Sequence, residues 1–164
     1  MAEVRAAGPD DVGALRRFGE AHVRAHYAPL IGAAAADSQV RDWWNETHLA
    51  AAVAGGLVVV AEDGELVGVG QRGRNGPEHV VYKLYVHPGQ RGRGLGPRLL
   101  DALIAQLPAA TGRLYIEHFA ANERAGAFYE REGFTVERIE PSTTGDPALA
   151  VVWRAKTLVS GKAS

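Results

Sequence analysis

The residues best suited to chemistry in this 164-residue sequence form a glycine-rich turn. Missing side chains at alternate positions leave backbone N–H groups open to a ligand, and two arginines add positive charge. A run of leucines at helical spacing follows, so the turn leads into a helix N-terminus, where the helix dipole attracts anions. The turn is therefore predicted to bind phosphate. Its residues are Arg91, Gly92, Arg93, Gly94, Leu95 and Gly96.

The spacing of these glycines excludes two common phosphate-binding motifs. A P-loop requires Gly-Lys followed by Ser or Thr, and no such lysine follows here. A dinucleotide-binding motif requires Gly-x-Gly-x-x-Gly, but counting from Gly92 places Pro97 at the last position. The turn instead resembles the Arg/Gln-x-x-Gly-x-Gly/Ala signature of the GNAT superfamily of acyl-CoA-dependent N-acyltransferases.

A second block of sequence strengthens this resemblance. Residues 122–134 are similar to the second motif of the family, Asn-x-x-Ala-x-x-Phe-Tyr-Glu-x-x-Gly-Phe. Asn122 is expected to cap a helix and Gly133 to end it. The two motifs stand in the order found in the family, with a predicted strand between them. The chain is therefore identified as a member of the GNAT superfamily, and its motif core spans residues 80–134.

The resemblance implies acetyl-CoA as the co-substrate. The glycine-rich turn would hold its pyrophosphate, and the backbone of Leu84, Tyr85 and Val86 would pair with the pantetheine arm as an added strand. Asn122 would contact the cofactor in addition to capping its helix. Tyr129 would donate a proton to the leaving thiolate, because a neutral tyrosine with a pKa of about 10 matches a thiolate in basicity.

The base that deprotonates the acceptor amine is less tightly specified. Glu117 stands where some protein N-terminal acetyltransferases of the family carry their base, and it would need a raised pKa or an ordered water. Many family members place a glutamate on the central strand, but Val80 and Val81 occupy its middle here. His87 and His118 are expected to be structural. The competing candidates, near the start of the central strand, are Glu78, His79 and Tyr82.

Composition excludes several classes of protein. The 18 basic and 19 acidic residues nearly cancel, which argues against nucleic acid and anionic membranes as partners. Without cysteine the chain forms no disulfide, thiolate metal site or cysteine nucleophile, and no metal is expected. The sequence shows neither a signal peptide nor an apolar run of membrane-spanning length, so a cytoplasmic location is expected.

The elements before the turn are predicted from apolar periodicity and from glycine, proline and Asp-Gly punctuation. Asp10 is the expected N-cap of the first helix, and Pro29 and Gly32 are expected to break it. Residues 63–64 and 72–77 are expected to form turns between strands. The predicted elements are a strand at 4–7, a helix from Asp10 to about Tyr27, a helix from Asp37 to Ala54, and strands at 57–61, 66–70 and 80–86.

The predicted fold follows from this order of elements and from the resemblance. After the turn, a helix, a strand at 113–118, the helix that begins after Asn122, and closing strands at 134–139 and 148–155 are expected. The resemblance implies an α+β fold, with a central, mostly antiparallel sheet of six to seven strands flanked by about four helices. The sequence shows no repeats or linkers, so a single domain over residues 1–164 is expected.

The acceptor is left open by the sequence. Trp43 and Trp44 are expected in the core or at its rim, with an amine pocket as the alternative. Asp37, Asp42 and Glu46 would face either solvent or a cationic amine.

The expected function is transfer of an acetyl group from acetyl-CoA to a primary amine. A small molecule is the first choice of acceptor and a protein N-terminus or lysine the second. A non-catalytic acyl-CoA sensor is the alternative. An exposed sheet edge, such as that expected for the C-terminal strand, would allow a homodimer.

Overall fold

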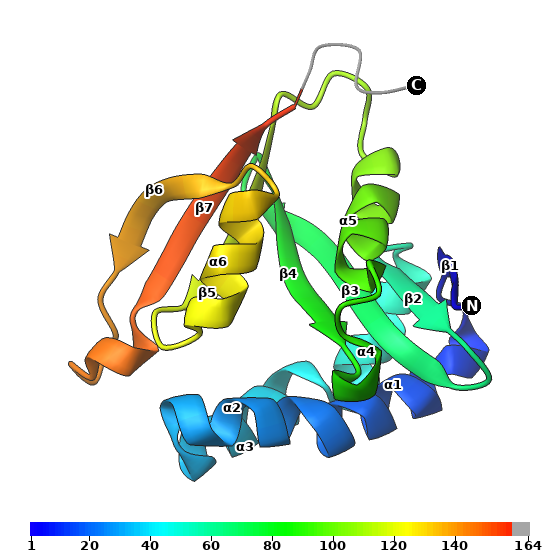
Figure 1. Ribbon diagram of the computed structural model, residues 1–164, viewed down its shortest axis with the longest axis horizontal. Helices are drawn as coiled ribbons and strands as arrows, with labels where there is room; N and C mark the ends of the chain where they lie inside the picture. The colour runs from blue at the N-terminus through cyan, green and yellow to red at the C-terminus, as the bar shows by residue number, and fades with distance from the viewer. Residues whose placement is uncertain (159–164) are drawn as a thin grey trace. The chain divides into compact units, whose positions relative to one another are not determined.

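The computed structural model describes residues 1–158, which form seven strands and six α-helices (Figure 1). The sheet order is β1-β2-β3-β4-β5-β7-β6. The predicted α+β class is thus confirmed, with more helices than expected. No helix within residues 1–158 is long and apolar enough to cross a membrane.

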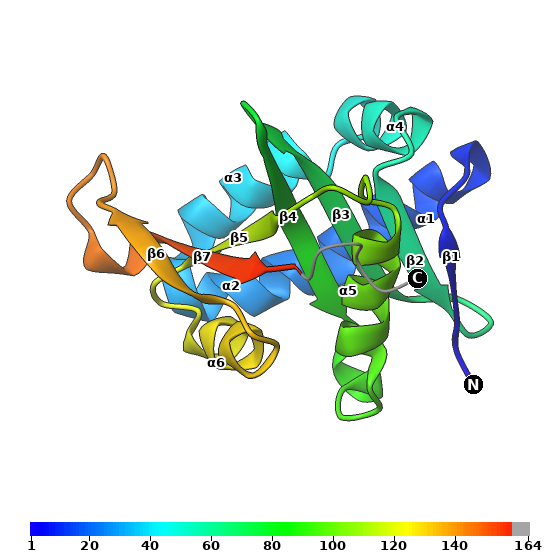
Figure 2. The same ribbon diagram turned by 90° about the horizontal axis from the view of Figure 1, so that it is seen from above.

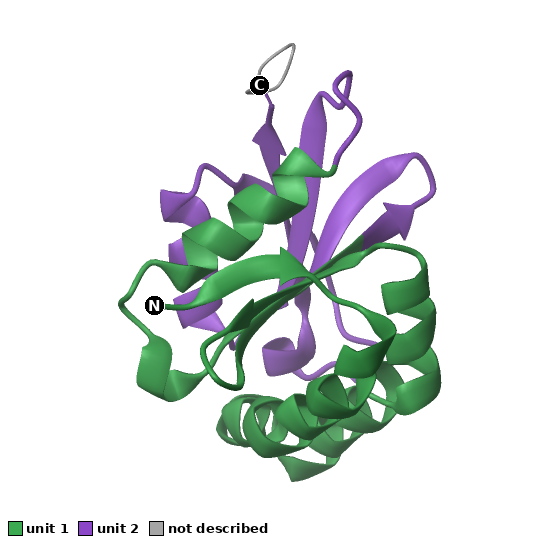
Figure 3. Ribbon diagram, turned by 90° about the vertical axis from the view of Figure 1, so that its right-hand side faces the viewer, with its two compact units in different colours: residues 1–72, 83–106 green, residues 73–82, 107–164 purple. Residues whose placement is uncertain are grey.

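The chain forms two compact units, shown in green and purple in Figure 3. Unit 1 comprises residues 1–72 and 83–106, and unit 2 comprises residues 73–82 together with the described residues from 107 onward. Strands β3 (Leu66–Asn75) and β4 (Glu78–Val86) contribute residues to both units. The single domain expected from the sequence stays a prediction.

Unit 1 contains the early helices and the helix that follows the glycine-rich turn. Helices α1 to α4 lie on one side of its strands and α5 lies on the other (Figure 3). Strand β2 is therefore apolar on both faces, and Val58 to Ala61 are all buried. The elements are β1 (Glu3–Ala6), α1 (Val12–Phe18), the π-helical turn η2 (Gly19–Val23), α2 (Arg24–Ile31), α3 (Ala33–Trp43), α4 (Glu46–Ala54), β2 (Val58–Glu62) and α5 (Leu95–Ala105).

The first helical segment differs from the prediction at both ends. Asp10 does not cap it, because the chain first forms a short 3-10 turn at Pro9–Asp11, in which Asp11 accepts a hydrogen bond from the Gly8 amide. Pro29 lies inside α2 and does not break it. A proline removes only one backbone donor, and the helix retains the burial of Tyr27 and Ile31. Gly32, with φ of +90°, ends the helix as predicted.

The second predicted helix is two helices, α3 and α4, and it begins earlier than expected. Asn45 separates them: its side chain accepts a hydrogen bond of 2.8 Å from the His48 amide and donates one of 2.9 Å to the Arg41 carbonyl. The break lets Trp44 turn inward, where it is 2% exposed. A side chain that caps both helix ends stabilises this corner, and periodicity alone did not reveal it.

Strand β3 is longer than predicted, because residues 72–75 continue the strand and do not form the expected turn. The turn is confined to Gly76, with φ of +61°, and Pro77. Within unit 2, the ring of Tyr82 lies against Gly73, where an added Cβ would be 2.9 Å from the ring. The missing side chain at Gly73 thus lets the hairpin extend.

Unit 2 contains β5 (Arg113–Phe119), α6 (Glu123–Arg131), β6 (Thr135–Glu140) and β7 (Val151–Thr157), close to the predicted bounds. Strand β5 pairs in parallel with β4 at Val80 and Val81, and antiparallel with β7. Strand β7 lies between β5 and β6, as Figure 2 shows. The expectation of an edge at the C-terminal strand is therefore wrong, since β6 is the edge strand. The homodimer itself stays a prediction.

Candidate functional site

The glycine-rich turn has the backbone conformation that its sequence predicts. Strand β4 ends at Val86, and α5 begins at Leu95 with Gly94 as its N-cap. Gly92 and Gly94 have φ of +79° and +77°, a region that side chains disfavour. Apart from the glycine and its two chain neighbours, no atom of the described residues lies within 4 Å of a Cβ added at either position. The turn is therefore open on the side where a ligand would approach.

Donors and positive charge converge on this turn. The amides of Leu95 and Gly96 stand in the first turn of α5, where a helix provides no acceptor of its own. Arg93 donates to the side-chain oxygen of Gln90 at 3.3 Å, and Arg91 is exposed. The leucines of α5 anchor it: Leu95, Leu99, Leu100 and Leu103 are all buried. The site thus fits a phosphate group such as the pyrophosphate of acetyl-CoA.

The segment that precedes the turn is half-buried and lies beside a group of aromatic rings in unit 1. The Tyr85 hydroxyl is 2.5 Å from that of Tyr27, and the ring centroids of Tyr85 and Trp44 are 5.6 Å apart. The rings of His22 and His87 meet edge to face at 4.4 Å. Burial, followed by the charge of His87, lowers the pKa of His22. Residues of η2, of α2 and of the junction between α3 and α4 thus present aromatic and imidazole groups to Tyr85 and His87.

Lys83 is the functional candidate in this region that sequence reasoning missed. It is 5% exposed, and its ammonium donates to the Gln71 side-chain oxygen at 3.0 Å and to the Trp43 carbonyl. Its Nζ lies 4.4 Å from the centre of the Trp44 ring. Burial lowers the pKa of Lys83 to about 7. The sequence contained one signal of this candidate: Lys83 is a lysine in the otherwise apolar strand of residues 80–86.

The charged residues of the early helices pair mainly with one another. Asp37 accepts from Arg24 at 2.8 Å, and Asp42 lies 3.4 Å from Arg41. A hollow of about 420 Å³ opens here, with the buried Trp44 in its wall. Its lining contains three arginines and three acidic residues, so it has no net preference for a cation. The lining residues are Arg16, Glu20, Arg24, Asp37, Val40, Arg41, Trp44, Asn45 and Glu46.

The second motif forms helix α6 in unit 2. Asn122 caps it as predicted, accepting a hydrogen bond of 3.3 Å from the Ala125 amide. Tyr129 is 6% exposed, and its ring lies 5.9 Å from His118 and 6.3 Å from Phe134, measured between centroids. The backbone of Tyr129 also accepts from the Phe134 amide at 2.9 Å. Tyr129 is thus held in a fixed position by its neighbours.

Glu117 lies on β5, also in unit 2. Burial raises its pKa, the negative charge of Glu140 raises it further, and Arg138 opposes them. Tyr82, a competing candidate, is close enough for the charge of Glu117 to raise its pKa, although burial is the larger cause and Glu78 also contributes. The structure therefore places Tyr82 within electrostatic reach of both Glu117 and Glu78.

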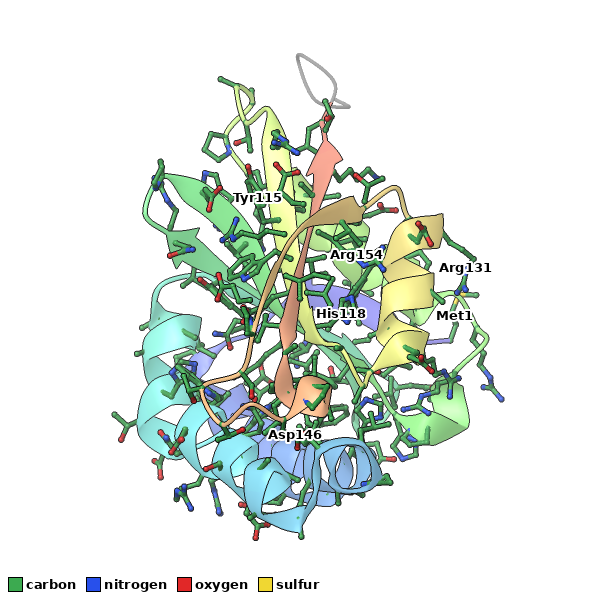
Figure 4. All side chains as sticks on the ribbon, turned by 90° about the vertical axis from the view of Figure 1, so that its left-hand side faces the viewer. Met1, Tyr115, His118, Arg131, Asp146 and Arg154 are labelled. Carbon is green, nitrogen blue, oxygen red and sulfur yellow. The ribbon has the colours of Figure 1, made fainter. Side chains whose placement is uncertain are left out.

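His118 has a structural environment, as expected from the sequence. Its Nε2 accepts a hydrogen bond of 3.0 Å from Arg154 Nε, and the two side chains face each other beside α6 (Figure 4). Its Nδ1 lies 2.9 Å from the Phe119 carbonyl, which requires the proton on Nδ1. His87 likewise uses its Nδ1 to accept from the Gly89 amide at 2.9 Å, which holds the short 3-10 turn at Pro88–Gln90.

The candidate residues thus divide between the two units. The residues expected to bind the cofactor at positions 84–96 are all in unit 1, and Glu117, Asn122 and Tyr129 are all in unit 2. Within residues 1–158, no group of three or more His, Asp or Glu side chains is arranged to hold a metal ion.

Comparison with known proteins identifies the family. Residues 54–136, half of the chain, match the acetyltransferase (GNAT) domain. The chain therefore belongs to the GNAT acetyltransferase family. The matched range includes the glycine-rich turn and the whole of the second motif.

The chain is also similar to particular members of that family. It is 37% identical over 111 residues to a mycothiol acetyltransferase from Propionibacterium freudenreichii subsp. shermanii, and the match covers 62% of this chain and 32% of that protein. The chain therefore spans about a third of that curated relative.

Solved structures confirm the fold. A PaiA N-acetyltransferase from Thermoplasma acidophilum, in complex with coenzyme A, has a TM-score of 0.80 and 17% identity, with 96% of this chain and 99% of that chain covered. A GCN5-related N-acetyltransferase from Rhodopseudomonas palustris has a TM-score of 0.78 and 24% identity, with 96% of each chain covered. At such identities the likeness concerns the fold alone.

Proposed function

We propose that this protein transfers the acetyl group of acetyl-CoA to a primary amine of a small molecule. The observation that carries the proposal is the open turn at the start of α5, with Gly92 and Gly94 in the left-handed region and nothing above them. Membership of the GNAT family and the coenzyme A complex of a protein with this fold support acetyl-CoA as the donor. The relative named mycothiol acetyltransferase supports a small-molecule acceptor.

In this proposal unit 1 binds the cofactor. The amides of Leu95 and Gly96, together with the charges of Arg91 and Arg93, hold the pyrophosphate, since a helix N-terminus and arginine both favour phosphate. The backbone of residues 84–86 pairs with the pantetheine arm as an added strand would. Acetyl-CoA supplies the acetyl group as an activated thioester.

Unit 2 provides the proton transfers in this proposal. Glu117 accepts a proton from the acceptor amine, which must lose its charge to become nucleophilic. The raised pKa of Glu117 supports this role, because a base works best when its pKa approaches the working pH. Tyr129 donates a proton to the departing thiolate, and Asn122 contacts the cofactor while it caps α6.

Calorimetric titration with acetyl-CoA, coenzyme A and ATP, run in parallel, tests the proposal first. Micromolar binding of both CoA species with no binding of ATP is the expected result. The proposal would be overturned if neither acetyl-CoA nor coenzyme A bound. A thiol-release assay with a panel of small primary amines then tests turnover. Binding of acetyl-CoA without thiol release for any amine or peptide would favour the sensor alternative.

A further inference from the structure

Lys83 is a buried cation whose neighbours carry no negative charge. Its neighbours are the side-chain amide of Gln71 on β3, the carbonyl of Trp43 at the end of α3, and the buried ring of Trp44, which follows α3. His48 of α4 is a titratable neighbour, and its Nε2 lies 3.4 Å from the Gln71 side-chain nitrogen. Burial lowers the pKa of His48, and like-charge repulsion from Lys83 lowers it further. Burying an ammonium without a carboxylate partner costs free energy, so a lysine at this position points to a functional role.

The contacts of Lys83 converge on the corner between α3 and α4, which consists of Trp43, Trp44 and Asn45. Asn45 joins the two helices by capping the end of one and the start of the other. Lys83 supplies a hydrogen bond from strand β4 to this corner, at the carbonyl end of α3, where a cation is favoured. Trp44 packs inward while Trp43 is 49% exposed. Lys83 therefore ties a surface corner to the central strand.

The position of Lys83 along β4 gives this link a functional meaning. Residue 84 begins the segment that we assign to the pantetheine arm, and Tyr85, two residues beyond Lys83, packs against the same Trp44 ring. Residues two apart on a strand point to the same face. The corner and the cofactor segment thus share Trp44 as a common neighbour, all within unit 1.

We propose that Lys83 is a positioning residue for acetyl transfer, because it ties the α3–α4 corner to strand β4. In this proposal, opening of the corner is coupled to the uptake of a proton by Lys83. The inference rests on the proposed function only for its effect on catalysis. The coupling between opening and protonation depends on the structure of unit 1 alone.

The direction of the coupling follows from the two states of Lys83. In the closed corner its pKa is about 7, and in an open, hydrated corner it returns toward 10.5. The open state binds the proton more tightly, so a fall in pH favours opening between these two values and has little further effect below 7. The equilibrium constant for opening should fall roughly 90-fold from pH 6 to pH 9. His48, whose pKa is also lowered in the closed state, adds to opening only below about 6.5.

Hydrogen exchange of the corner amides measures this equilibrium without any substrate. In the structure, the amides of Trp44, His48 and Leu49 donate to the Val40 carbonyl, the Asn45 side chain and the Asn45 carbonyl. In the proposal, these amides exchange when the corner opens. In the wild type, their protection factors should be low near pH 7 and rise by up to about tenfold per pH unit above it. In Lys83→Met they should not depend on pH above 7. Protection that is independent of pH in the wild type, or an equal slope in Lys83→Met, would overturn the coupling.

Three further variants separate Lys83 from other causes. Lys83→Arg stays charged throughout, so its corner should be weakly protected at every pH. His48→Gln should retain the wild-type slope above pH 7, and loss of that slope would assign the coupling to His48 instead. Lys156→Met, which removes a partly exposed lysine of β7 in unit 2, is the matched control and should behave as the wild type.

Kinetics test the positioning role with an amine from the acceptor panel. Lys83→Met should raise the KM for acetyl-CoA at least fivefold and change kcat less than twofold, because the corner adjoins the cofactor segment through Trp44. Lys83→Arg, whose corner stays open, should show no recovery. An unchanged KM alongside a confirmed exchange slope would overturn the positioning role. Failure of the wild type to bind acetyl-CoA would instead count against the proposed function and leave the exchange result standing.

Discussion

The two units of this protein use their candidate residues in opposite ways. Unit 1 presents backbone: the open turn at residues 91–96 depends on glycines and on the start of α5. In the proposed mechanism, unit 2 supplies side chains that transfer protons: Glu117 on β5 and Tyr129 on α6. Ligand binding at a site built from backbone depends on backbone conformation and on nearby charge. The pKa values at a site built from titratable side chains depend on how deeply those side chains are buried. Substitutions in the two units should therefore separate binding from proton transfer.

In each unit, burial drives a candidate residue toward its neutral form. Burial lowers the pKa of Lys83 in unit 1 and raises the pKa of Glu117 in unit 2. The shifts have opposite signs and the same cause, because a low-dielectric surrounding disfavours either charge. In both cases the charged form of the residue destabilises the folded protein. Ionisable residues with shifted pKa values are common at functional sites.

The largest effect is expected from a charge at the phosphate turn. Gly94→Asp should weaken acetyl-CoA binding at least 100-fold, since it puts a carboxylate on a strained backbone where the pyrophosphate would approach. Gly64→Asp is the matched control, because Gly64 has φ of +76° and open space around it in a surface turn. Calorimetry should show normal affinity in the control. Equal affinities in the two variants would contradict the phosphate site.

The next effect tests unit 2 in isolation. Tyr129→Phe should lower kcat by about 100-fold, within the range for loss of a positioned proton donor, and leave the Kd for acetyl-CoA nearly unchanged. Tyr115→Phe, on the neighbouring strand β5, should retain wild-type turnover. Steady-state kinetics with calorimetry would measure both. Wild-type turnover in Tyr129→Phe would remove it as the donor.

Glu117→Gln sharpens the comparison, because activity and stability should change in opposite directions. A raised carboxyl pKa stabilises the fold at low pH, and this contribution is lost as the pH rises through the folded pKa. Glutamine stays neutral, so the variant should have a higher free energy of unfolding in urea at pH 8 and a kcat reduced at least tenfold. It should also lose the acidic limb of the pH–rate profile. Retention of that limb would assign the base elsewhere.

A smaller effect concerns the packing of unit 1. Gly19→Ala should lower the free energy of unfolding by about 1–3 kcal/mol, because an added Cβ would lie 2.8 Å from the buried ring of Trp44. Gly13→Ala is the control: it also lies in a helical segment, but its Cβ would meet only the flexible end of Arg17. That change should stabilise the fold by about 0.5–1 kcal/mol. If the two variants changed the free energy of unfolding equally, the Trp44 side chain would have moved to accommodate the new methyl group at position 19.

The smallest effect compares the two asparagine caps. Asn122→Ala in unit 2 should lower the free energy of unfolding by about 1 kcal/mol, the usual value for an N-cap. Asn45→Ala in unit 1 should be more costly, by about 1 kcal/mol more, since its side chain also donates to the carbonyls of Arg41 and Asp42. Denaturation in urea would rank them. The reverse order would mean that the corner of unit 1 tolerates an open cap.

The sequence by itself determined the features that depend on local chemistry. Glycines at 92 and 94 allow a left-handed backbone, Asn122 prefers a helix cap, and Gly32 and Gly133 suit helix ends, whatever surrounds them. The two motifs and the order of strands and helices were sufficient for the family and the fold class.

Tertiary structure decided the features that depend on distant neighbours. The helix continues through Pro29 because its inner face is buried, and the break at Asn45 follows the burial of Trp44. Sheet order made β6 the edge strand. The properties of Lys83 come from residues 12 and 40 positions away, Gln71 and Trp43, which exclude water from its amino group. Desolvation is a property of the packed fold, so local sequence could supply the lysine but not its pKa.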